Sequence, residues 1–595
     1  MRRAAGLTAG VLSMAAASHV FFWLVVRPEL VFQCQQPIFF LDGDFFRSFA
    51  ALPGGLLAYI AAFAGQALFF PAIGATLLLL IFLCGSVLTL RVLCGRASGT
   101  ALELLFAAAL AFLFLMQCQY EHNLLIGLGF ILQLAFFLLY ARSGNTGRFG
   151  STAAFLLLAS LSYALSGAQH FYFALLCLLQ ACFEGRIIRG FLYAAIAAAI
   201  AVLGSLVYGV GLAEAFSSSI IRLPAMDRSI SLCHAGYGIL PVLLVLSRFL
   251  RFKSSSPKGG RQNRGLIAST IIGLAGGMLA VLLAGETEIK QILKIELASG
   301  ERKWTEVLAT AGKMKKPHIR ATWQVNRALF HLGRLSEDMF SFRQTYGTSG
   351  LVFSQALSFQ MPFQRRDIFL DLGHVNEAQH WAHEETAPIG DHPENLKVLA
   401  MANLAKGQYR AANLFLNSLR KTIPYRRWAK RYPVHLSSHV SADPDSIIGR
   451  ITAQMPTSDF IVNLEYPERD LERLLASNPK NRMVFEYLMA HYLLTCRLGR
   501  LVQNICRLND FGYEGIPRHY EEALLVYLGQ SGKSQTEFCG RGISEKTLRR
   551  FEEFRFVIRK HRGDGKAAES ELRKRFAGTY WIYSMFENPL MAGNP

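Results

Sequence analysis

The sequence predicts an all-α protein, in which a polytopic α-helical membrane domain of about nine spans precedes a soluble α-helical repeat domain of the tetratricopeptide-like type. Three observations lead to this fold class. Apolar runs fill residues 1–285 and are missing from 286–595, basic residues alternate between the loops that join the runs, and a motif in the second half recurs after 34 residues. With 52% apolar and only 17% charged residues, the composition fits a chain that is half membrane.

Nine apolar runs are candidates for membrane spans, for which about 20 residues are needed. Several of them are shorter than that, so one or two could be tilted or re-entrant. The first run follows Met1-Arg2-Arg3 and contains Ala15-Ala16-Ala17-Ser18, so it could be a cleaved signal peptide. It continues through Phe21–Val26, beyond the usual signal core, which favours an uncleaved span. The expected spans are 5–26, 69–90, 101–117, 124–141, 151–166, 170–183, 190–212, 234–250 and 265–284.

The charges of the loops predict the orientation. One side of the membrane carries fourteen basic residues and the other four, and basic residues gather on the cytoplasmic side. Nine spans with a cytoplasmic N-terminus place the C-terminal domain on the outer side. The four outer basic residues are Arg27, Arg47, Arg222 and Arg228.

The formal net charge of +20 does not indicate a nucleic-acid partner. The membrane half has 18 basic and 8 acidic residues, and the other half has 44 basic and 34 acidic ones, so each half contributes +10. The first excess follows from the orientation, and the second is a mixed, solvated surface that would be attracted to anionic lipid headgroups. The lipid bilayer is therefore the expected partner.

The ten cysteines follow no metal-binding or redox spacing. By the predicted orientation, Cys34, Cys118 and Cys233 lie on the outer side, where a disulfide among them could form. The alternative is that all of them are small apolar packing residues.

A repeat is visible in the second half. The segment Gly373–Trp381 aligns with Gly407–Phe415, with glycine, a bulky residue, alanine and an aromatic residue in matching positions. The offset of 34 residues is the tetratricopeptide period, and weaker echoes occur at Leu332–Leu335 and Leu498–Leu501. An irregular helical bundle is the alternative. Solenoids of this kind bind partners on concave surfaces.

Histidines concentrate beside the first repeat segment. His380 and Glu384 are four residues apart and could share one helix face, but the pattern is not a recognised zinc motif. A solvated helix surface is the simpler interpretation, and no metal site is predicted here. The histidines are His374, His380, His383 and His392.

The predicted orientation gathers polar residues at the outer face, mainly on the long first outer loop at 27–68. Carboxylates near a lipid interface are costly unless they have a partner or a role. They suit a general base or a divalent cation, and arginine and histidine could hold a phosphate. The candidate catalytic residues are Asp42, Asp44 and Glu121, and the candidate substrate-binding residues are His122, His170, Arg222, Arg228 and His234.

A structural interpretation of the same residues is available. Outer loops are polar because they meet water, Asp42-Gly43 is a common turn pair, and Asp44 could cap a helix that begins at Phe45.

The layout of residues 1–285 resembles the GT-C class of membrane glycosyltransferases. That resemblance implies an acidic residue of the first outer loop as base or metal ligand, a polyprenyl-phosphate-linked sugar donor and a short interfacial helix, here expected at 56–68. Asp42 and Asp44 match the acidic position.

The whole chain resembles an uncharacterised family of Bacteroidota membrane proteins, in Leu41–Phe46 with Pro53-Gly54-Gly55, Asn478-Pro479 with Phe485–Ala490, and Thr579-Tyr580-Trp581. The resemblance implies an inner-membrane protein with a periplasmic helical tail and brings no activity. Two hypotheses follow, a transferase that uses a lipid-linked sugar at the outer face, or a membrane-anchored scaffold whose helical domain binds envelope proteins. A transporter is less favoured, because charge within the spans is scarce.

Overall fold

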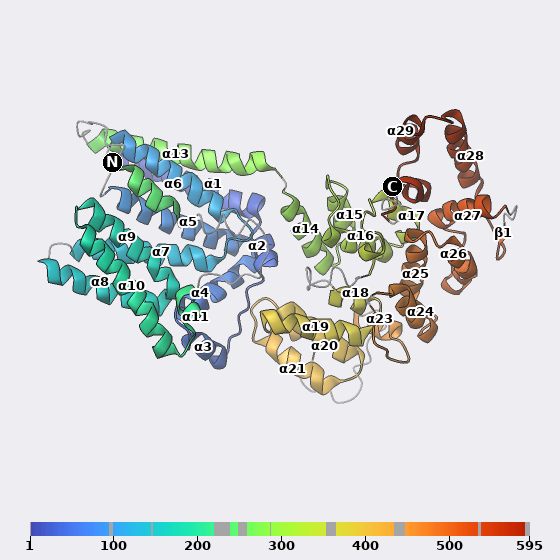
Figure 1. The fold of residues 1–595 in the computed structure, drawn as a ribbon, viewed down its shortest axis with the longest axis horizontal. Helices are drawn as coiled ribbons and strands as arrows, with labels where there is room; N and C mark the ends of the chain where they lie inside the picture. Colours follow the sequence, from blue (N-terminus) through green and yellow to red (C-terminus); the bar gives the residue numbers. More distant parts are fainter. Residues whose placement is uncertain are drawn as a thin grey trace. The chain divides into compact units, whose positions relative to one another are not determined.

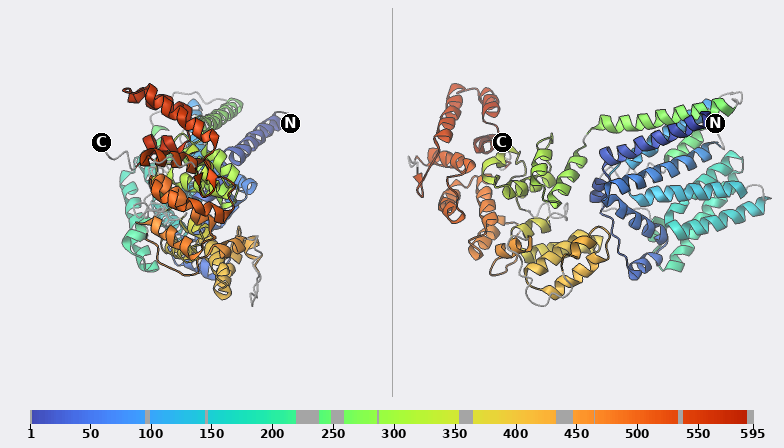
Figure 2. Two further views of the ribbon diagram at one scale, coloured as in Figure 1. Left: turned by 90° about the vertical axis from the view of Figure 1, so that its right-hand side faces the viewer. Right: turned by 180° about the vertical axis from the view of Figure 1, so that it is seen from behind.

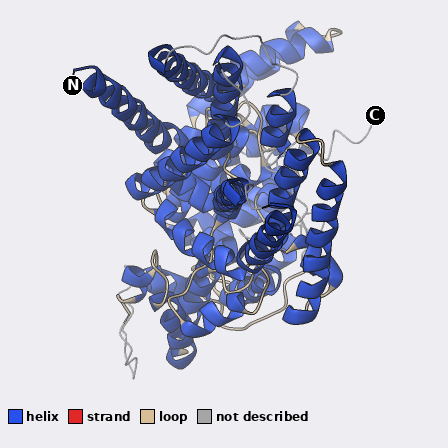
Figure 3. Cartoon of the chain, turned by 90° about the vertical axis from the view of Figure 1, so that its left-hand side faces the viewer, coloured by secondary structure: helices blue, strands red, loops and turns tan. Residues whose placement is uncertain are grey.

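The computed structural model describes residues 2–94, 99–143, 147–218, 238–247, 259–285, 287–352, 365–432, 447–463, 465–532 and 537–589. These residues are predominantly helical (Figure 3). The strands in the described part are Glu537–Phe538 (β1) and Arg541–Gly542 (β2), an antiparallel pair. The prediction of an all-α fold is therefore confirmed. The chain forms two compact units, Met1–Glu286 with Lys421–Pro424 (unit 1), and Thr287–Arg420 with Tyr425–Pro595 (unit 2) (Figure 1).

Unit 1 contains six described helices that are long and apolar enough to cross a membrane, or seven if one bent pair is a single crossing. Nine crossings are thus not evident. The first predicted span continues, after a 53° bend, into a second helix, and two others fall within one apolar stretch, Phe149–Phe183. The predicted span 234–250 is described only at Gly238–Ser247, with the rest outside the described residues.

Two of these apolar stretches are interrupted, one by the bend at Arg27 and the other by a turn within Phe149–Phe183. Arg27 has a left-handed backbone (φ 61°) and Pro28 opens the next helix, so the chain changes direction between them. In the stretch Phe149–Phe183 the chain reverses at a short 3-10 turn, Gly167–Gln169. The reversal brings the rings of Phe155 and Phe173 to 5.5 Å from each other. Eighteen residues of continuous helix would separate them by about 27 Å. Two helices of a hairpin therefore account for this stretch.

The helices of unit 1 pack as a bundle in which α6 and α13 lie side by side (Figures 1 and 2). Gly265, Gly273 and Gly277 of α13 face α6, and a Cβ at Gly273 would come within 2.6 Å of the carbonyl oxygen of Ala107. Small residues spaced by fours allow such close approach between membrane helices. The elements are α1 (Arg2–Phe21), η1 (Phe22–Val26), α2 (Pro28–Gln35), α3 (Gly43–Ala50), α4 (Gly55–Gly65), η2 (Gln66–Phe69), α5 (Pro71–Cys94), α6 (Gly99–Gln117), α7 (Leu124–Arg142), α8 (Gly147–Ser166), η4 (Gly167–Gln169), α9 (His170–Phe183), α10 (Ile187–Tyr208), α11 (Leu212–Ser217) and α13 (Gly259–Ala284).

The helix expected at 56–68 is present as α4 and η2, and it is an apolar helix packed against α7 and α8. Leu57 and Ala61 are buried there. The backbone is closely packed where α4 begins, because a Cβ at Gly55 would lie 1.7 Å from the carbonyl oxygen of Phe49. The glycine pair Gly54-Gly55 thus lets α3 fold back onto α4.

Unit 2 is built from consecutive helix pairs, of which α18–α21 lie side by side in Figure 2. Five of its described turns that follow an α-helix share one geometry, in which a left-handed residue comes after the helix and the next amide bonds to a carbonyl five residues back. This is the Schellman ending of a helix. The left-handed residues are Arg302, Gly333, Gly373, Gly407 and Cys496.

The predicted pair Gly373 and Gly407 occupies two of these turns, but the echo at Leu498–Leu501 is out of register. Its turn residue is Cys496, three positions before Gly499. The structure therefore shows helix pairs with uneven spacing, and it does not confirm the predicted tetratricopeptide-like repeat. The further helices are α14 (Glu288–Gly300), α15 (Trp304–Ala311), α16 (Ile319–His331), α17 (Leu335–Asp338), α18 (Arg365–Asp371), α19 (Val375–Ile389), α20 (Pro393–Ala405), α21 (Tyr409–Arg420), α22 (Arg426–Ala429), α23 (Ile447–Gln454), α24 (Pro467–Ser477), α25 (Arg482–Leu494), α26 (Leu498–Asn504), α27 (Arg518–Ser531), α28 (Glu545–Lys560), α29 (Gly565–Phe576) and α30 (Tyr580–Ile582), with 3-10 turns at Met339–Ser341, Gly347–Gly350 and Ile505–Phe511, and the terminal turn η10 (Tyr583–Glu587).

Candidate functional site

The two candidate aspartates of the segment 27–68 lie at the start of α3, and each is paired with a basic side chain. The Asp42 carboxylate accepts a hydrogen bond from Lys421 Nζ at 2.7 Å, and Lys421 packs with unit 1. This hydrogen bond lowers the pKa of Asp42 below its usual range. Asp44 is exposed and pairs with Arg47 one turn further along α3 at 3.0 Å. The two carboxylates therefore have separate partners.

The aromatic residues that flank these aspartates have a structural role. The Phe39 ring is buried and meets the rings of Phe45, Tyr59 and Phe63 at centroid distances of 5.6, 5.2 and 5.2 Å. Edge-on and tilted contacts of this kind are favourable beyond the area that they bury. The cluster fixes α3 onto α4, and it explains why an acidic loop is so rich in phenylalanine.

Glu121 and His122 lie on another loop, at 118–123, between α6 and α7. Glu121 is half-buried, and His122 is buried. Gln35 of α2 holds this loop, because its amide donates to the carbonyl oxygens of Tyr120 and His122, both at 2.9 Å. Burial lowers the pKa of His122 to about 4, so its imidazole is neutral at physiological pH.

His170 opens α9 and acts as a tether inside the bundle. It is fully buried, and its two ring nitrogens lie 3.0 Å from the carbonyl oxygens of Gly167 and Ala197. Both nitrogens thus lie against backbone carbonyl oxygens, one in η4 and one in α10. This arrangement fits a packing role at the α8–α9 turn.

The remaining candidates, Arg222, Arg228 and His234, lie outside the described residues. Of the five described candidates, Asp42 and Asp44 start one helix, Glu121 and His122 are neighbours on a second loop, and His170 is inside the bundle. A catalytic role for Asp42, Asp44 and Glu121 stays a prediction, as does a divalent cation.

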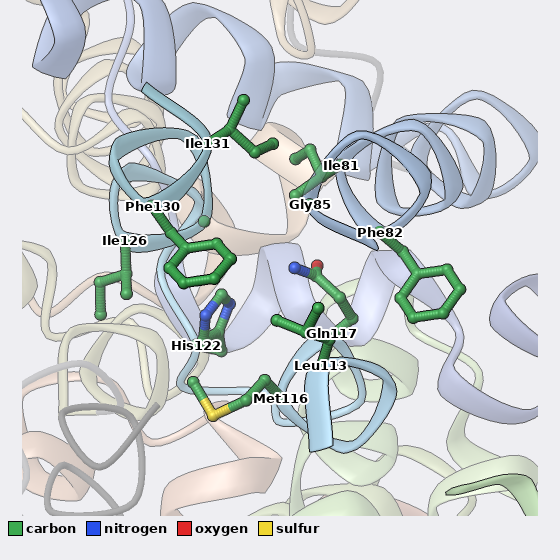
Figure 4. Close-up of a pocket in the computed structure, with 11 residues that line it drawn as sticks. Ile81, Phe82, Gly85, Leu113, Met116, Gln117, His122, Ile126, Phe130 and Ile131 are labelled. Carbon is green, nitrogen blue, oxygen red and sulfur yellow. The ribbon is translucent and has the colours of Figure 1, made fainter. Parts of the chain in front are cut away.

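A small cavity opens next to His122, between α5, α6 and α7 (Figure 4). Its volume is about 30 Å³, and the Gln117 amide and the His122 ring point into it among apolar side chains. Gln117 is not among the residues predicted from the sequence, because one amide at the end of an apolar run gives no signal. The lining residues are Ile81, Phe82, Gly85, Leu113, Met116, Gln117, His122, Ile126, Gly127, Phe130 and Ile131.

A much larger hollow lies in unit 2, and we call it the C-terminal groove. It has a volume of about 1280 Å³ and is formed by α27, α28 and the segment from Arg575 to Met585. Trp581 and Phe554 are buried at its base with ring centroids 5.3 Å apart, and Phe551 packs on Trp581. Trp581 is fixed by a hydrogen bond from its indole nitrogen to the carbonyl oxygen of Glu522.

The edges of the C-terminal groove combine exposed apolar side chains with charge. Phe556 is 58% exposed and Met585 49%. Four arginines and two glutamates line the groove, which leaves two positive charges in excess. They are Arg549, Arg555, Arg559 and Arg575, with Glu552 and Glu553.

The histidines of 374–392 do not assemble into a metal site. His374 is buried and stacks on Phe460, His392 caps α20, and His380 and His383 are exposed on α19. Within the described ranges, no group of three histidine, cysteine, aspartate or glutamate side chains could hold a metal ion.

A disulfide joins Cys506 and Cys539 across 33 residues of unit 2. This pair was not predicted from the sequence, because the two residues meet only when the segment after α27 folds back. Cys34 and Cys118 lie in unit 1, and Cys233 is outside the described residues.

Reducing this disulfide is expected to destabilise unit 2 by about 2–4 kcal/mol, because closing a loop of this length restricts the unfolded chain. The measurement is the melting temperature of the purified protein with and without reductant, and Cys506→Ser should reproduce the loss. Replacing Cys84, which is exposed on α5, by serine is the control and should leave the melting temperature unchanged. Reaction of both thiols with a labelling reagent in protein purified without reductant would contradict the prediction.

Comparison with known proteins gives a family and no activity. No curated protein and no solved structure matches the chain. One family model matches residues 3–587, nearly the whole length. The chain therefore belongs to the family of unknown function DUF6057.

Proposed function

We propose that the protein is a membrane-anchored scaffold that binds an acidic, amphipathic helix of a partner protein in the C-terminal groove. The apolar helices of unit 1, which are compatible with a membrane-spanning region, serve as the anchor. The observation that carries the proposal is the groove itself, with its aromatic base and basic edges.

The apolar part of the groove supports a helical occupant. Phe556, Ile558 and Met585 are large apolar side chains exposed along its edges, and Trp581 lies at its base. Contiguous apolar surface rimmed by polar groups marks interaction sites in soluble domains. The 16 residues of α28 span about 24 Å, which matches four turns of a partner helix laid along it.

The charges support an acidic occupant. The whole segment 545–576, which includes the groove residues of α28 and Arg575, carries eleven basic and six acidic residues. Some glutamates pair with more than one arginine. Arg555 and Arg559 both approach the carboxylate of Glu552, at 3.2 and 3.8 Å. Extra carboxylates from a partner would therefore be attracted, and complementary charge also speeds association.

The disulfide and the loop charges support a location of unit 2 outside the cytoplasm. Disulfides persist in oxidising compartments such as the bacterial periplasm. The basic residues of the loops favour a cytoplasmic N-terminus, and an odd number of crossings then leads to the other side. The proposed partner is accordingly a periplasmic or membrane-bound envelope protein.

The test uses the full-length protein in detergent and three defined probes. An 18-residue amphipathic peptide with glutamates on its polar face is expected to bind saturably, and to crosslink to a photoreactive residue placed at Phe556. The same residue placed at Lys546, on α28 outside the groove lining, is the control and should give no crosslink. Equal binding of a peptide with lysines instead of glutamates would refute an acidic partner, and stronger binding of anionic lipid vesicles would assign the surface to the membrane.

A further inference from the structure

The cavity beside His122 exists because two helices present glycine to it. Gly85 of α5 and Gly127 of α7 both line the cavity. A Cβ at Gly127 would lie 3.2 Å from Ile81 Cγ2, 3.4 Å from His122 Cε1 and 3.5 Å from Gln117 Nε2. The imidazole and the amide thus approach the same point from two sides, as Figure 4 shows.

Gln117 carries an unsatisfied polar atom into this cavity. The side chain is 93% buried, since its exposed fraction is 7%, and its Oε1 atom has no hydrogen-bond partner among the described residues. A buried acceptor without a partner is expensive, and such atoms in proteins are nearly always satisfied by protein groups or ordered water. Gln133, which is buried in α7 of the same bundle, is bonded to Ser162 and Ser166. The Gln117 oxygen therefore needs a donor.

We propose that the cavity is a binding site for an ordered water molecule, which donates a hydrogen bond to Gln117 Oε1 and is hydrogen-bonded to the His122 ring. A volume of about 30 Å³ is enough for one water and too small for a sugar or a phosphate. Since the lining residues carry no carboxylate, arginine or lysine, neither a metal ion nor an anion is stabilised there.

The bound water has a structural consequence for the outer loop. It ties the end of α6, at Gln117, to His122 in the middle of the loop 118–123, which Gln35 already holds from the other side. The loop presents Glu121 and ends at Asn123, whose side chain caps α7. The water would thus fix the position of Glu121, whatever role that residue has.

The sign of the change in melting temperature caused by Gln117→Met distinguishes a hydrated cavity from a dry one. If water is bound, the substitution removes one of its partners and should lower the melting temperature by about 2–4 °C. If the cavity is dry, the substitution removes an unsatisfied acceptor and should raise the melting temperature, which would overturn the proposal. Gln133→Met is the matched control and should lower the melting temperature in either case, because its amide is bonded.

A second measurement does not depend on any variant folding well. A map of the full-length protein in a lipid nanodisc, at a resolution that shows other buried waters, should contain a peak within hydrogen-bond distance of both Gln117 and His122. A map that shows other buried waters and no peak there would refute the proposal.

Discussion

Replacing Asp371 with asparagine is expected to lower the free energy of unfolding of unit 2 by about 3–5 kcal/mol. The Asp371 carboxylate is 6% exposed and accepts hydrogen bonds from Arg327, at 2.7 Å, and from His331, at 3.1 Å. Arg302 lies 3.9 Å away. The Arg327 guanidinium is itself buried, so without the carboxylate its charge would have no counter-charge at this distance. Thermal or denaturant unfolding of the full chain, followed by circular dichroism, measures the loss.

The same site predicts a pH dependence with a definite sign. Burial alone raises the pKa of Asp371, but Arg327, His331 and Arg302 outweigh it and hold the pKa well below its usual range. A carboxyl with a lowered folded-state pKa contributes its stability above the unfolded-state pKa, and loses it as the pH falls through the folded-state value. The gap between wild type and Asp371→Asn should therefore be full at neutral pH, and it should shrink only below about pH 4.

An exposed ion pair of the same unit is the control. Arg334 and Asp338 are joined at 2.6 Å on α17 and its preceding turn, with both side chains partly in solvent. Asp338→Asn should cost less than about 1 kcal/mol, as exposed pairs usually do. Similar losses for the two substitutions would mean that the buried network is not what stabilises the core of unit 2.

Reversing two groove charges, with Arg555→Glu and Arg559→Glu together, is expected to weaken binding of the acidic peptide by at least about tenfold. The change converts attraction into repulsion at the edge where the partner's carboxylates would lie, and a tenfold loss corresponds to about 1.4 kcal/mol. Fluorescence anisotropy with a labelled peptide measures the dissociation constant. The loss should shrink at high salt, because exposed charges are screened.

The control for that experiment is a charge reversal outside the groove, on the hairpin formed by α28 and α29. Arg562 is exposed between α28 and α29 and does not line the groove. Arg562→Glu should leave peptide binding nearly unchanged, and neither variant should change the melting temperature by much, because all three arginines are exposed. An equal loss of affinity in both variants would indicate that the net charge of the tail, and not the groove, attracts the peptide.

Local sequence was a good guide to the helices and to their turns. The apolar runs gave the long helices of unit 1, and the repeated glycines marked the turns at Gly373 and Gly407. The same logic failed at Leu498–Leu501, because a cysteine, Cys496, takes the left-handed turn position that glycine usually holds. The number of crossings was not fixed by hydropathy, since the described helices give six, or seven if the bent pair is one crossing, where the apolar runs predict nine.

The candidate site shows where sequence proximity misleads. Asp42 and Asp44 are two residues apart, yet the start of α3 directs one toward Lys421, 379 residues away, and the other toward Arg47. Gln117 and the disulfide between Cys506 and Cys539 had no sequence signal at all, because their partners are set by packing. The groove likewise depends on α27, α28 and the final turns meeting in space.

The sequence by itself determined that this is an all-α chain with apolar helices in the first half and amphipathic helix pairs in the second. Hydrophobic periodicity and turn residues are local properties, and they are written in neighbouring positions. Only the tertiary structure decided which polar atoms are satisfied, where a cavity stays open, and which exposed aromatic and basic side chains share one groove. Those features depend on contacts between distant segments, and the free energy of each contact is set by burial that no single segment encodes.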